Sequence, residues 1–420
     1  MGILGVAMTK TILFISPTGT MDNGAEISIF NLMKFLVSKG FQVLNVFPDY
    51  RVPVQKNYLE QMKKAGIQAI GIPAVKWWWE EAPGGLPGTH YQRVKSYEDN
   101  IKRIREILNQ NKVDLVISNT ANVFQGAWAA AEENIRHFWL IHEFPEGEFG
   151  YYREKLNFIN EFSDEIFAVT GALTKNLQSL LHDRTIYSFA PFSEIRIDKF
   201  SSNEDTSKGI ICIGRLTERK NQLELIKAYR KINSETFKLI FIGDWDIEYK
   251  EKCDQYISKY NLQNIEFRGH SSTPWAEVGQ NKIAVFPSKM ETFGLVYIES
   301  ILNGIPTILS NNLGHLSSYH WMGEVGHLYD LGDLDNLSNM IQHILNNFEN
   351  EHRDSLAKVS LLKDRYTLEN TYDQVLEMIN SKSIVKDKNL VEYSNMIKGK
   401  DTFKLFFRDF VKSLLTLKKI

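Results

Sequence analysis

Runs of consecutive apolar residues alternate with amphipathic stretches along most of the chain. This pattern is typical of buried parallel strands and the helices that connect them. In the first half it predicts strands at residues 11–16, 41–47, 113–118, 137–141 and 165–169. A second series is predicted at residues 209–214, 238–243, 265–269, 282–287 and 306–310. Such a rhythm predicts an α/β fold with two doubly wound parallel sheets in tandem.

The break between the two series suggests the domain limits. We expect a first Rossmann-like domain over residues 1–190 and a linker over residues 191–207. A second Rossmann-like domain then spans residues 208–380, and a C-terminal extension covers residues 381–420. Ligands of open α/β sheets bind beyond the carboxyl ends of the strands, so candidate chemistry is sought there.

Composition narrows the class of protein. The 420 residues are 43% hydrophobic and 24% charged, as in ordinary globular proteins, and the net charge of −2 gives no reason to expect a nucleic-acid partner. The two cysteines, Cys212 and Cys253, lie in apolar patterns, which excludes a disulfide framework and suits a reducing compartment. No signal peptide and no apolar run of membrane-spanning length is recognised, so we expect a cytoplasmic protein.

Two glutamates eight residues apart, Glu291 and Glu299, follow the predicted strand at 282–287. Glu291 falls in the strand-to-helix loop and Glu299 inside the next helix, with Gly294 at the helix start. Free backbone N–H groups at a helix start attract anions. A phosphate site between two carboxylates suits a nucleotide that carries a sugar, although this spacing also arises by chance among solvated side chains.

A basic turn follows the predicted strand at 209–214. The strand ends at Gly214, and Arg215 and Lys220 bracket the turn into the next helix. Cations at this place suit a diphosphate, because the Arg guanidinium forks to two oxygens and Lys acts as a point charge. The alternative is an ordinary solvated basic turn.

Together these segments resemble the donor-binding domain of the retaining glycosyltransferases of family 4. The matching stretches are Gly214-Arg215-Leu216 with Lys220-Asn221, and Glu291-Thr292-Phe293-Gly294-Leu295 through Glu299 to Gly304-Ile305-Pro306. The resemblance extends over about residues 9–380. It implies the GT-B architecture, in which two Rossmann-like domains face a central cleft, the second holding the nucleotide sugar and the first the acceptor.

The resemblance also implies roles for particular residues. Arg215 and Lys220 would neutralise the diphosphate, Glu291 would contact the transferred sugar, and Glu299 would accept hydrogen bonds from the ribose. The backbone of Phe293, Gly294 and Leu295 would bind the phosphate or the sugar. Gly269 and His270, after the strand at 265–269, would meet the base, without distinguishing a UDP-linked from a GDP-linked donor. No cofactor is implied.

Two places in the first domain match the family less fully. Gly24 belongs to Asn23-Gly24-Ala25-Glu26, which is similar to the family's Gly-Gly-Ala-Glu segment with Asn23 in place of the first glycine. That departure leaves ordinary helix capping as an equal alternative. His142 matches a family histidine close to the transferred sugar and the acceptor, whereas we interpret His137 as structural.

The sequence Asp244-Trp245-Asp246 has the form of the metal-binding motif of the other large glycosyltransferase architecture. It follows a strand at the place where family 4 members often have Gly-Asp and a loop. We therefore interpret it as that loop and expect no metal.

Two further segments suggest contact with a membrane surface. Trp77-Trp78-Trp79 would dip into the interface or hold a long acceptor, or else pack on their own domain. Residues 403–419 place aromatic and aliphatic side chains at helical spacing with flanking Lys and Arg, which predicts either a peripheral membrane helix or a helix that packs on protein.

The sequence thus predicts a retaining hexosyl- or N-acetylhexosaminyltransferase. It would transfer a sugar from a nucleotide donor to a glycan or lipid-linked acceptor in cell-surface polysaccharide or glycoconjugate synthesis, at the inner face of the cell membrane. The alternatives are a disaccharide or sugar-phosphate synthase, and a catalytically silent glycan-binding subunit on the same fold.

Overall fold

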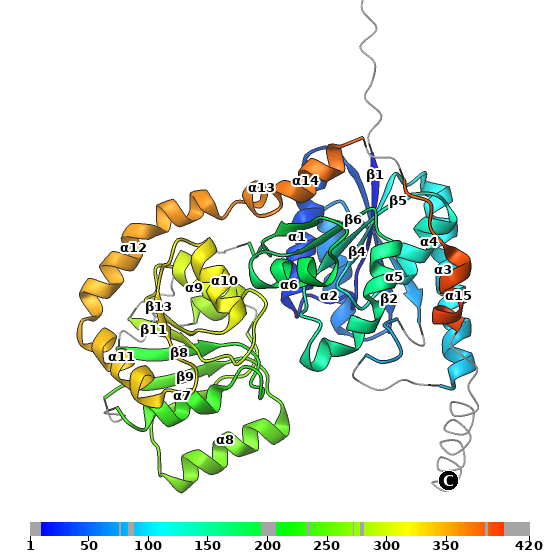
Figure 1. Cartoon of the computed structure of the whole chain (residues 1–420). Helices are drawn as coiled ribbons and strands as arrows, with labels where there is room; N and C mark the ends of the chain where they lie inside the picture. Colours follow the sequence, from blue (N-terminus) through cyan, green and yellow to red (C-terminus); the bar gives the residue numbers. More distant parts are fainter. Residues whose placement is uncertain are drawn as a thin grey trace, which may run out of the picture. The chain divides into compact units, whose positions relative to one another are not determined.

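The computed structural model describes residues 10–74, 77–82, 88–194, 207–232, 236–271, 273–277, 281–382 and 385–398. Two compact units are present (Figure 1). Among the described residues, the first unit comprises those within 1–169, 173–192 and 372–420, and the second those within 170–172 and 193–371. Each unit is built on one parallel sheet, as the alternating pattern predicts.

The first unit contains a seven-stranded sheet in the order β3-β2-β1-β4-β5-β6-β7, with every neighbouring pair parallel. Its strands are β1 (Thr11–Ile15), β2 (Gln42–Asp49), β3 (Gln68–Pro73), β4 (Leu115–Asn119), β5 (Arg136–Ile141), β6 (Glu165–Val169) and β7 (Ile186–Phe189). Its helices are α1 (Gly24–Ser38), α2 (Val54–Lys64), α3 (His90–Asn111), α4 (Gln125–Glu132), η1 (Gly147–Lys155), α5 (Leu156–Glu161), α6 (Ala172–Leu180), α14 (Asp373–Asn380) and α15 (Leu390–Lys398).

The second unit contains a six-stranded parallel sheet in the order β10-β9-β8-β11-β12-β13. Its strands are β8 (Gly209–Ile213), β9 (Lys238–Ile242), β10 (Ile265–Phe267), β11 (Lys282–Phe286), β12 (Thr307–Ser310) and β13 (His327–Tyr329). Its helices are α7 (Gln222–Tyr229), α8 (Ile247–Lys259), η2 (Pro274–Ala276), α9 (Leu295–Leu302), α10 (Leu313–Trp321), α11 (Leu334–Asn346), α12 (Phe348–Arg365) and α13 (Leu368–Thr371).

The central strands are buried along their whole length, which explains why they read as continuous apolar runs. All five residues of β1, β8 and β11 are buried. In both sheets the chain first moves outward from the central strand and then returns to its other side, between β1 and β4 and between β8 and β11. These reversal points are where ligands of open α/β sheets bind.

The second unit ends earlier in the chain than expected. The sequence placed the limit of the second domain at residue 380, but the second unit ends at residue 371. Helix α14 belongs to the first unit because the Tyr372 ring stacks on Phe189 at 5.4 Å and the Arg136 guanidinium donates to the carbonyl of Met378. A buried ion pair of Lys388 with Asp164, at 2.9 Å, fixes the chain farther on.

The described part of the expected extension therefore packs on the first unit, and α15 lies beside α3 and α4 (Figure 1). The predicted amphipathic helix at 403–419 and most of the predicted linker at 191–207 lie outside the described residues. In the part of the chain that is described, no helix is both long and apolar enough to cross a membrane.

The three consecutive tryptophans pack on their own domain, which is one of the two alternatives that the sequence left open; the alternative role at a membrane interface is not supported. Trp77 and Trp79 are 1% and 2% exposed. The indole N–H groups of Trp77, Trp78 and Trp79 donate to the carbonyls of Ser16, Pro17 and Ala121, at 3.0, 3.0 and 2.8 Å. Each polar handle of the triplet is satisfied within the fold, and the segment joins the loops that follow β1 and β4.

Candidate functional site

The strongest candidate site lies in the second unit, at the reversal point between β8 and β11. The loop after β8 carries Arg219 and Lys220, and the loop after β11 carries Glu291. Because β8 and β11 are parallel neighbours, both loops leave the same edge of the sheet. The two sequence motifs, 71 positions apart by residue number, therefore meet in space.

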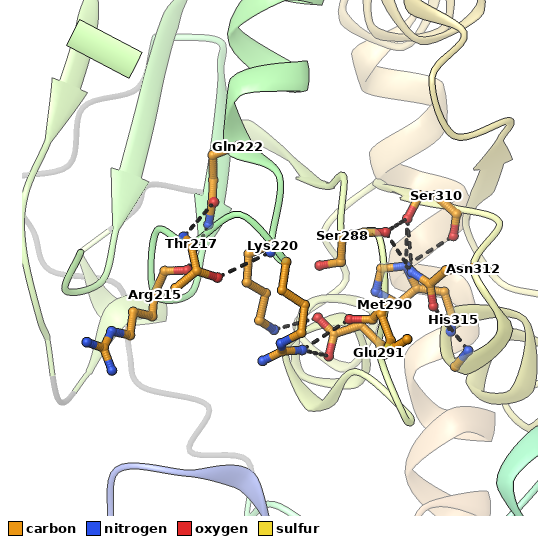
Figure 2. Close-up of polar contacts among 12 residues, drawn as sticks. Arg215, Thr217, Lys220, Gln222, Ser288, Met290, Glu291, Ser310, Asn312 and His315 are labelled. Carbon is orange, nitrogen blue, oxygen red and sulfur yellow. Dashed lines mark hydrogen bonds and ion pairs between the residues drawn. The ribbon is translucent and has the colours of Figure 1, made fainter. Parts of the chain in front are cut away.

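Glu291 is the centre of this site. Its carboxylate is 7% exposed, with Oε1 at 2.6 Å from Nζ of Lys220 and Oε2 at 3.3 Å from Nη1 of Arg219. Figure 2 shows the Lys220 side chain directed toward Glu291. The Arg219 guanidinium also donates to the carbonyl of Met290. This hydrogen bond keeps the loop that carries Glu291 next to Arg219.

The charge state of Glu291 follows from these neighbours. Burial by itself would raise the pKa of the carboxyl, but Lys220 and Arg219 oppose that effect and lower the pKa to about 2. Glu291 is thus a buried carboxylate that stays ionised at neutral pH, next to two cations. Such a group orients hydroxyls and cannot act as a proton donor at neutral pH.

Gly294 is the N-cap of helix α9 and has a conformation that suits glycine. Its φ is 85°, and a Cβ there would lie 3.0 Å from Cδ2 of His315. Within the described residues, the backbone N–H groups of Gly294, Leu295 and Val296 have no hydrogen-bond acceptor. They form the kind of donor set that binds an anion at a helix start, close to Glu291 in the chain. The adjacent side chain of Phe293 is 2% exposed and packs against Trp321.

His315 completes the surroundings of Glu291 and was missed by sequence reasoning. The imidazole is fully buried, and burial lowers its pKa to about 4, so it is neutral at physiological pH. Nδ1 lies 2.9 Å from Nδ2 of Asn312, whereas Nε2 has no partner among the described residues. The amide oxygen of Asn312 accepts from the N–H groups of Gly314 and His315, which starts α10 and places the imidazole.

Gly314 allows α10 to approach the carboxylate loop. A Cβ at this position would lie 2.0 Å from the carbonyl oxygen of Glu291. The local sequence of β12 and α10, with Asn312 as a cap and Gly314 next to the loop, therefore fixes where Glu291 sits. The only sequence signal for His315 was its position shortly after a predicted strand end.

Arg215 does not join the cluster around Glu291. Its side chain is exposed and forms no ion pair within the described residues, and Figure 2 shows it pointing away from Glu291. Arg219 occupies the place beside Glu291 instead. Gly214 adopts a φ of 141°, and the nearest atom to a Cβ there would be Cε of Lys220 at 3.9 Å.

Glu299 lies on α9 and is already held by two donors. Ser193 Oγ donates to Oε1 at 2.8 Å, and the Trp275 indole N–H donates to Oε2 at 2.9 Å. Burial raises the pKa of Glu299, and these two hydrogen bonds oppose the rise. Neither Ser193 nor Trp275 was recognised from the sequence, which gave no signal linking them to Glu299.

The loop predicted to meet the base follows β10. Gly269 has a φ of 76°, and its carbonyl accepts from the N–H of Gly243 at 2.7 Å. His270 is exposed. The loop is thus anchored to the end of β9 and leaves a side chain free to contact a ligand.

The Asp244-Trp245-Asp246 segment is used locally. The Asp246 carboxylate accepts from the N–H of Tyr249 as the cap of α8. Across the ranges that the structure describes, there is no group of three or more His, Cys, Asp or Glu side chains that could hold a metal ion.

The first unit places His142 at the carboxyl end of β5. It is 8% exposed, burial lowers its pKa to about 3, and its neutral Nε2–H donates to the amide oxygen of Asn119 at 2.8 Å.

The next residue, Glu143, was not singled out from the sequence. Burial raises its pKa to about 7, and its carboxylate accepts from the N–H groups of Ala121 and His142. By contrast, His137 lies within β5 and contacts Ser118 Oγ, in line with a structural role.

Gly24 is the first residue of α1, and the cap is Asn23, whose side chain accepts from the N–H of Glu26. The capping alternative is therefore present. Glu26 is fully buried, and its carboxylate accepts from the N–H groups of Thr18 and Gly19 at 2.8 and 3.0 Å. The β1–α1 loop is thus wrapped around a carboxylate of the helix that follows it.

Comparison with known proteins gives two family matches that divide the chain as the fold does. Residues 22–187 match "Glycosyltransferase Family 4", and residues 194–359 match "Glycosyl transferases group 1". Most of the chain, and nearly all of the two sheets, lies within these matches.

Individual relatives are more distant. The chain is 28% identical over 136 residues to the capsular polysaccharide biosynthesis glycosyltransferase CapM of Staphylococcus aureus, covering 32% of this chain and 36% of CapM. It is 20% identical over 321 residues to the poly(ribitol-phosphate) alpha-N-acetylglucosaminyltransferase of S. aureus strain COL, covering 71% and 63%. The matches to the curated relatives cover less than two thirds of their lengths.

A solved structure of Anabaena HepE, in complex with UDP and glucose, has a TM-score of 0.72 to this chain at 18% identity, covering 89% of this chain and all of HepE. At this level of identity the likeness concerns the fold, which is the two-domain GT-B arrangement of parallel-sheet domains.

Proposed function

The chain belongs to the glycosyl transferases of group 1, in family 4, and on that premise we propose that it is a retaining glycosyltransferase. It would move a hexose or N-acetylhexosamine from a UDP- or GDP-linked donor to a hydroxyl of a glycan or lipid-linked acceptor. The observation that carries this proposal is the ionised Glu291 held by Lys220 and Arg219 beside the start of α9.

The donor would be bound by opposite charges that already lie side by side. The diphosphate would contact Lys220 and Arg219 and the free N–H groups at Gly294 and Leu295. Glu291 would accept hydrogen bonds from hydroxyls of the transferred sugar. Because the cations are held in place before the donor arrives, they would stabilise charge where it develops in the transition state without reorganising.

Glu299 would bind the ribose. Each of its oxygens accepts one hydrogen bond, from Ser193 or from Trp275, and a carboxylate oxygen has capacity for another. Gly269 and His270 would contact the base, and Arg215 would reach the diphosphate only by changing its side-chain rotamer.

In the proposed reaction the acceptor oxygen forms a bond to the anomeric carbon as the bond from that carbon to the diphosphate oxygen breaks. The bonding pair leaves with the nucleoside diphosphate, and the acceptor proton passes to that leaving oxygen. Attack and departure occur on the same face of the sugar, so no enzyme nucleophile is required. His142, neutral and fixed by Asn119, would contact the sugar or the acceptor. No resident metal or cofactor is needed.

Several relatives favour a role in surface-polymer synthesis. CapM is named for capsular polysaccharide, and the S. aureus transferase is named for poly(ribitol phosphate). By analogy we propose that this chain extends a cell-surface glycan. Peripheral membrane binding through residues 403–419 stays a prediction.

A panel of UDP- and GDP-linked sugars in a thermal-shift assay tests the donor, because a ligand that binds the folded state raises its apparent stability. We expect one nucleotide sugar to raise Tm in the wild type and to lose this effect in Lys220→Ala. The anomeric configuration of the product, measured by NMR, tests retention. Turnover that disappears with EDTA and returns with manganese would contradict the metal-free reaction.

A further inference from the structure

A cavity of about 710 Å³ that is open to solvent lies within the first unit, apart from the residues discussed above. It is located at the carboxyl ends of β2 and β3, against α3. Its lining includes the end of β2, the β2–α2 loop and part of α3, chiefly Asp49, Tyr50, Arg51, Lys95, Asp99 and Asn100. The volume falls in the range of about 300–1,000 Å³ that is usual for small-molecule sites.

The charges around the cavity are balanced but unpaired. Asp49 and Asp99 contribute two carboxylates, and Arg51 and Lys95 contribute two cations. None of these four side chains forms an ion pair within the described part of the chain. Because the formal charges cancel, the cavity does not select an anion or a cation. Instead, it presents separate donors and acceptors to a neutral ligand that has both kinds of group.

A buried amide adds a further polar group. Asn100 is 1% exposed, and its Nδ2 has no hydrogen-bond partner among the described residues. A buried donor that remains unsatisfied costs about 1–3 kcal/mol. Because Nδ2 is buried from solvent, a ligand hydroxyl would reach it only after the Asn100 side chain turned toward the cavity.

Tyr50 supplies the apolar component, with a side chain that is 44% exposed. A half-exposed aromatic ring next to Asp, Asn and Gln side chains is a chemical combination that suits a sugar. The ring packs on the C–H face, and the planar polar groups bind neighbouring hydroxyls.

The cavity wall is connected to the loop that follows β1. Gln55 accepts from the N–H of Tyr50 and donates to the carbonyl of Thr18, at 3.1 and 3.0 Å. On the other side, Tyr97 donates to the carbonyl of Trp78, whose indole N–H donates to the carbonyl of Pro17. The cavity is therefore held in a fixed position relative to the carboxyl edge of the sheet that also carries His142.

We propose that this cavity binds neutral sugar units of the acceptor glycan, ones that do not themselves react. This inference rests on the proposed glycosyl transfer for its biological purpose, but the binding itself does not depend on a donor. The cavity makes the enzyme select an acceptor by its preceding sugars as well as by the reacting hydroxyl.

The test begins with binding alone. The full chain is applied, without nucleotide, to an array of neutral and anionic oligosaccharides that covers α- and β-linked hexoses and N-acetylhexosamines, and calorimetry measures Kd for the bound glycans. We expect a neutral oligosaccharide to bind, with Kd raised at least about tenfold by Tyr50→Ala and by Asp99→Asn. Glu98→Gln, on the same helix but outside the cavity lining, is the matched control and leaves Kd unchanged.

Absence of binding to any neutral glycan, binding of anionic glycans only, or equal affinity in all variants would overturn the proposal.

Transfer kinetics then test whether the glycan that binds the cavity is part of the acceptor or a free sugar. In Tyr50→Ala we expect a higher KM for the acceptor, with donor hydrolysis unchanged. If Tyr50→Ala weakens the binding of free oligosaccharides but leaves the acceptor KM unchanged, the cavity does not bind the acceptor. If no nucleotide sugar is turned over while the array binding follows the variants, the proposed function fails and the sugar-binding cavity stands.

Discussion

The ammonium of Lys220 lies 2.6 Å from Oε1 of Glu291, although the two residues come from different strand-to-helix loops. The pair exists because β8 and β11 are parallel neighbours at the reversal point of the second sheet. With Arg219 at 3.3 Å from the other carboxylate oxygen, Glu291 has a cation beside each of its oxygens. A donor that brings two phosphates and a sugar would meet an arrangement of charges that is complete before binding.

The first prediction concerns this pair. In the proposed reaction Lys220 lies where negative charge develops on the leaving diphosphate, so we expect Lys220→Ala to lower kcat at least about a hundredfold. Glu291→Ala removes the group that is proposed to orient the sugar, with a similar expected loss. Steady-state transfer assays measure both effects, and circular dichroism checks that the fold persists.

Lys289→Ala is the control for charge. Lys289 lies in the same loop as Glu291 and is about half exposed, but it pairs with Glu218. Its removal should change kcat less than about threefold, since exposed ion pairs contribute little. Rates near those of the wild type in Lys220→Ala or Glu291→Ala would refute the site assignment.

The second prediction concerns pH and Glu143. Burial raises the pKa of its carboxyl to about 7, above its unfolded value of about 4.3. Between these two values the folded protein binds more protons than the unfolded chain, so this group lowers stability as pH rises from about 4.3 through 7. Glu291 behaves oppositely: its contribution is present above its unfolded pKa and is lost as pH falls toward about 2.

We therefore expect Glu143→Gln to gain stability over the wild type as pH rises. The unfolding free energy of the variant minus that of the wild type should be larger at pH 8 than at pH 5. The amide oxygen of Gln retains an acceptor for the N–H groups of Ala121 and His142. Urea unfolding at the two pH values measures the difference, and Glu154→Gln, at an exposed position of η1, serves as the control. If the pH dependence of the Glu143→Gln variant equals that of the wild type, Glu143 does not titrate as stated.

The sequence predicted two parallel sheets and placed Lys220 and Glu291 after strand ends, but it did not predict the contact between them. Strand patterns located β8 and β11, and the rule for parallel sheets placed Lys220 and Glu291 at one edge. Strands β3, β7 and β13 were not predicted. Strand β3 lies at the edge of its sheet and is mostly exposed or half-buried, so it lacks an apolar run, and β7 and β13 have only four and three residues.

The features that sequence reasoning missed depend on tertiary packing. His315 influences the charge of Glu291 because α10 packs on the carboxylate loop, which needs Gly314 at one point of contact. Arg215 and Arg219 lie in the same turn, and only tertiary packing decides that Arg219 faces Glu291 while Arg215 points away from it. For the tryptophan triplet the sequence left both an exposed role and packing on its own domain open, and only the fold shows that the indole N–H groups donate to carbonyls inside the domain.

The third prediction follows from that point of contact. In Gly314→Ala the new Cβ would lie 2.0 Å from the carbonyl oxygen of Glu291, so the carboxylate loop or α10 must move. We expect a loss of about 1–3 kcal/mol in unfolding free energy, as is usual for overpacking, together with a marked loss of kcat. Gly150→Ala is the control, because a Cβ there meets nothing within 4 Å. Equal stability and activity in both variants would show that Gly314 does not position Glu291.

The fourth prediction separates donor binding from the chemical step. Trp275→Phe keeps the aromatic ring but removes the indole N–H that donates to Oε2 of Glu299. A hydrogen bond to a charged group contributes about 1.5–3 kcal/mol. Glu299 is proposed to bind the ribose, which keeps the same contacts before and during transfer. Loss of the indole hydrogen bond should therefore raise the donor KM about tenfold or more and leave kcat nearly unchanged. Ser193→Ala, which removes the donor to Oε1, should act in the same direction. A variant that lowers kcat while the donor KM stays constant would instead place Glu299 at the reacting bond, because only contacts that strengthen in the transition state act on kcat alone.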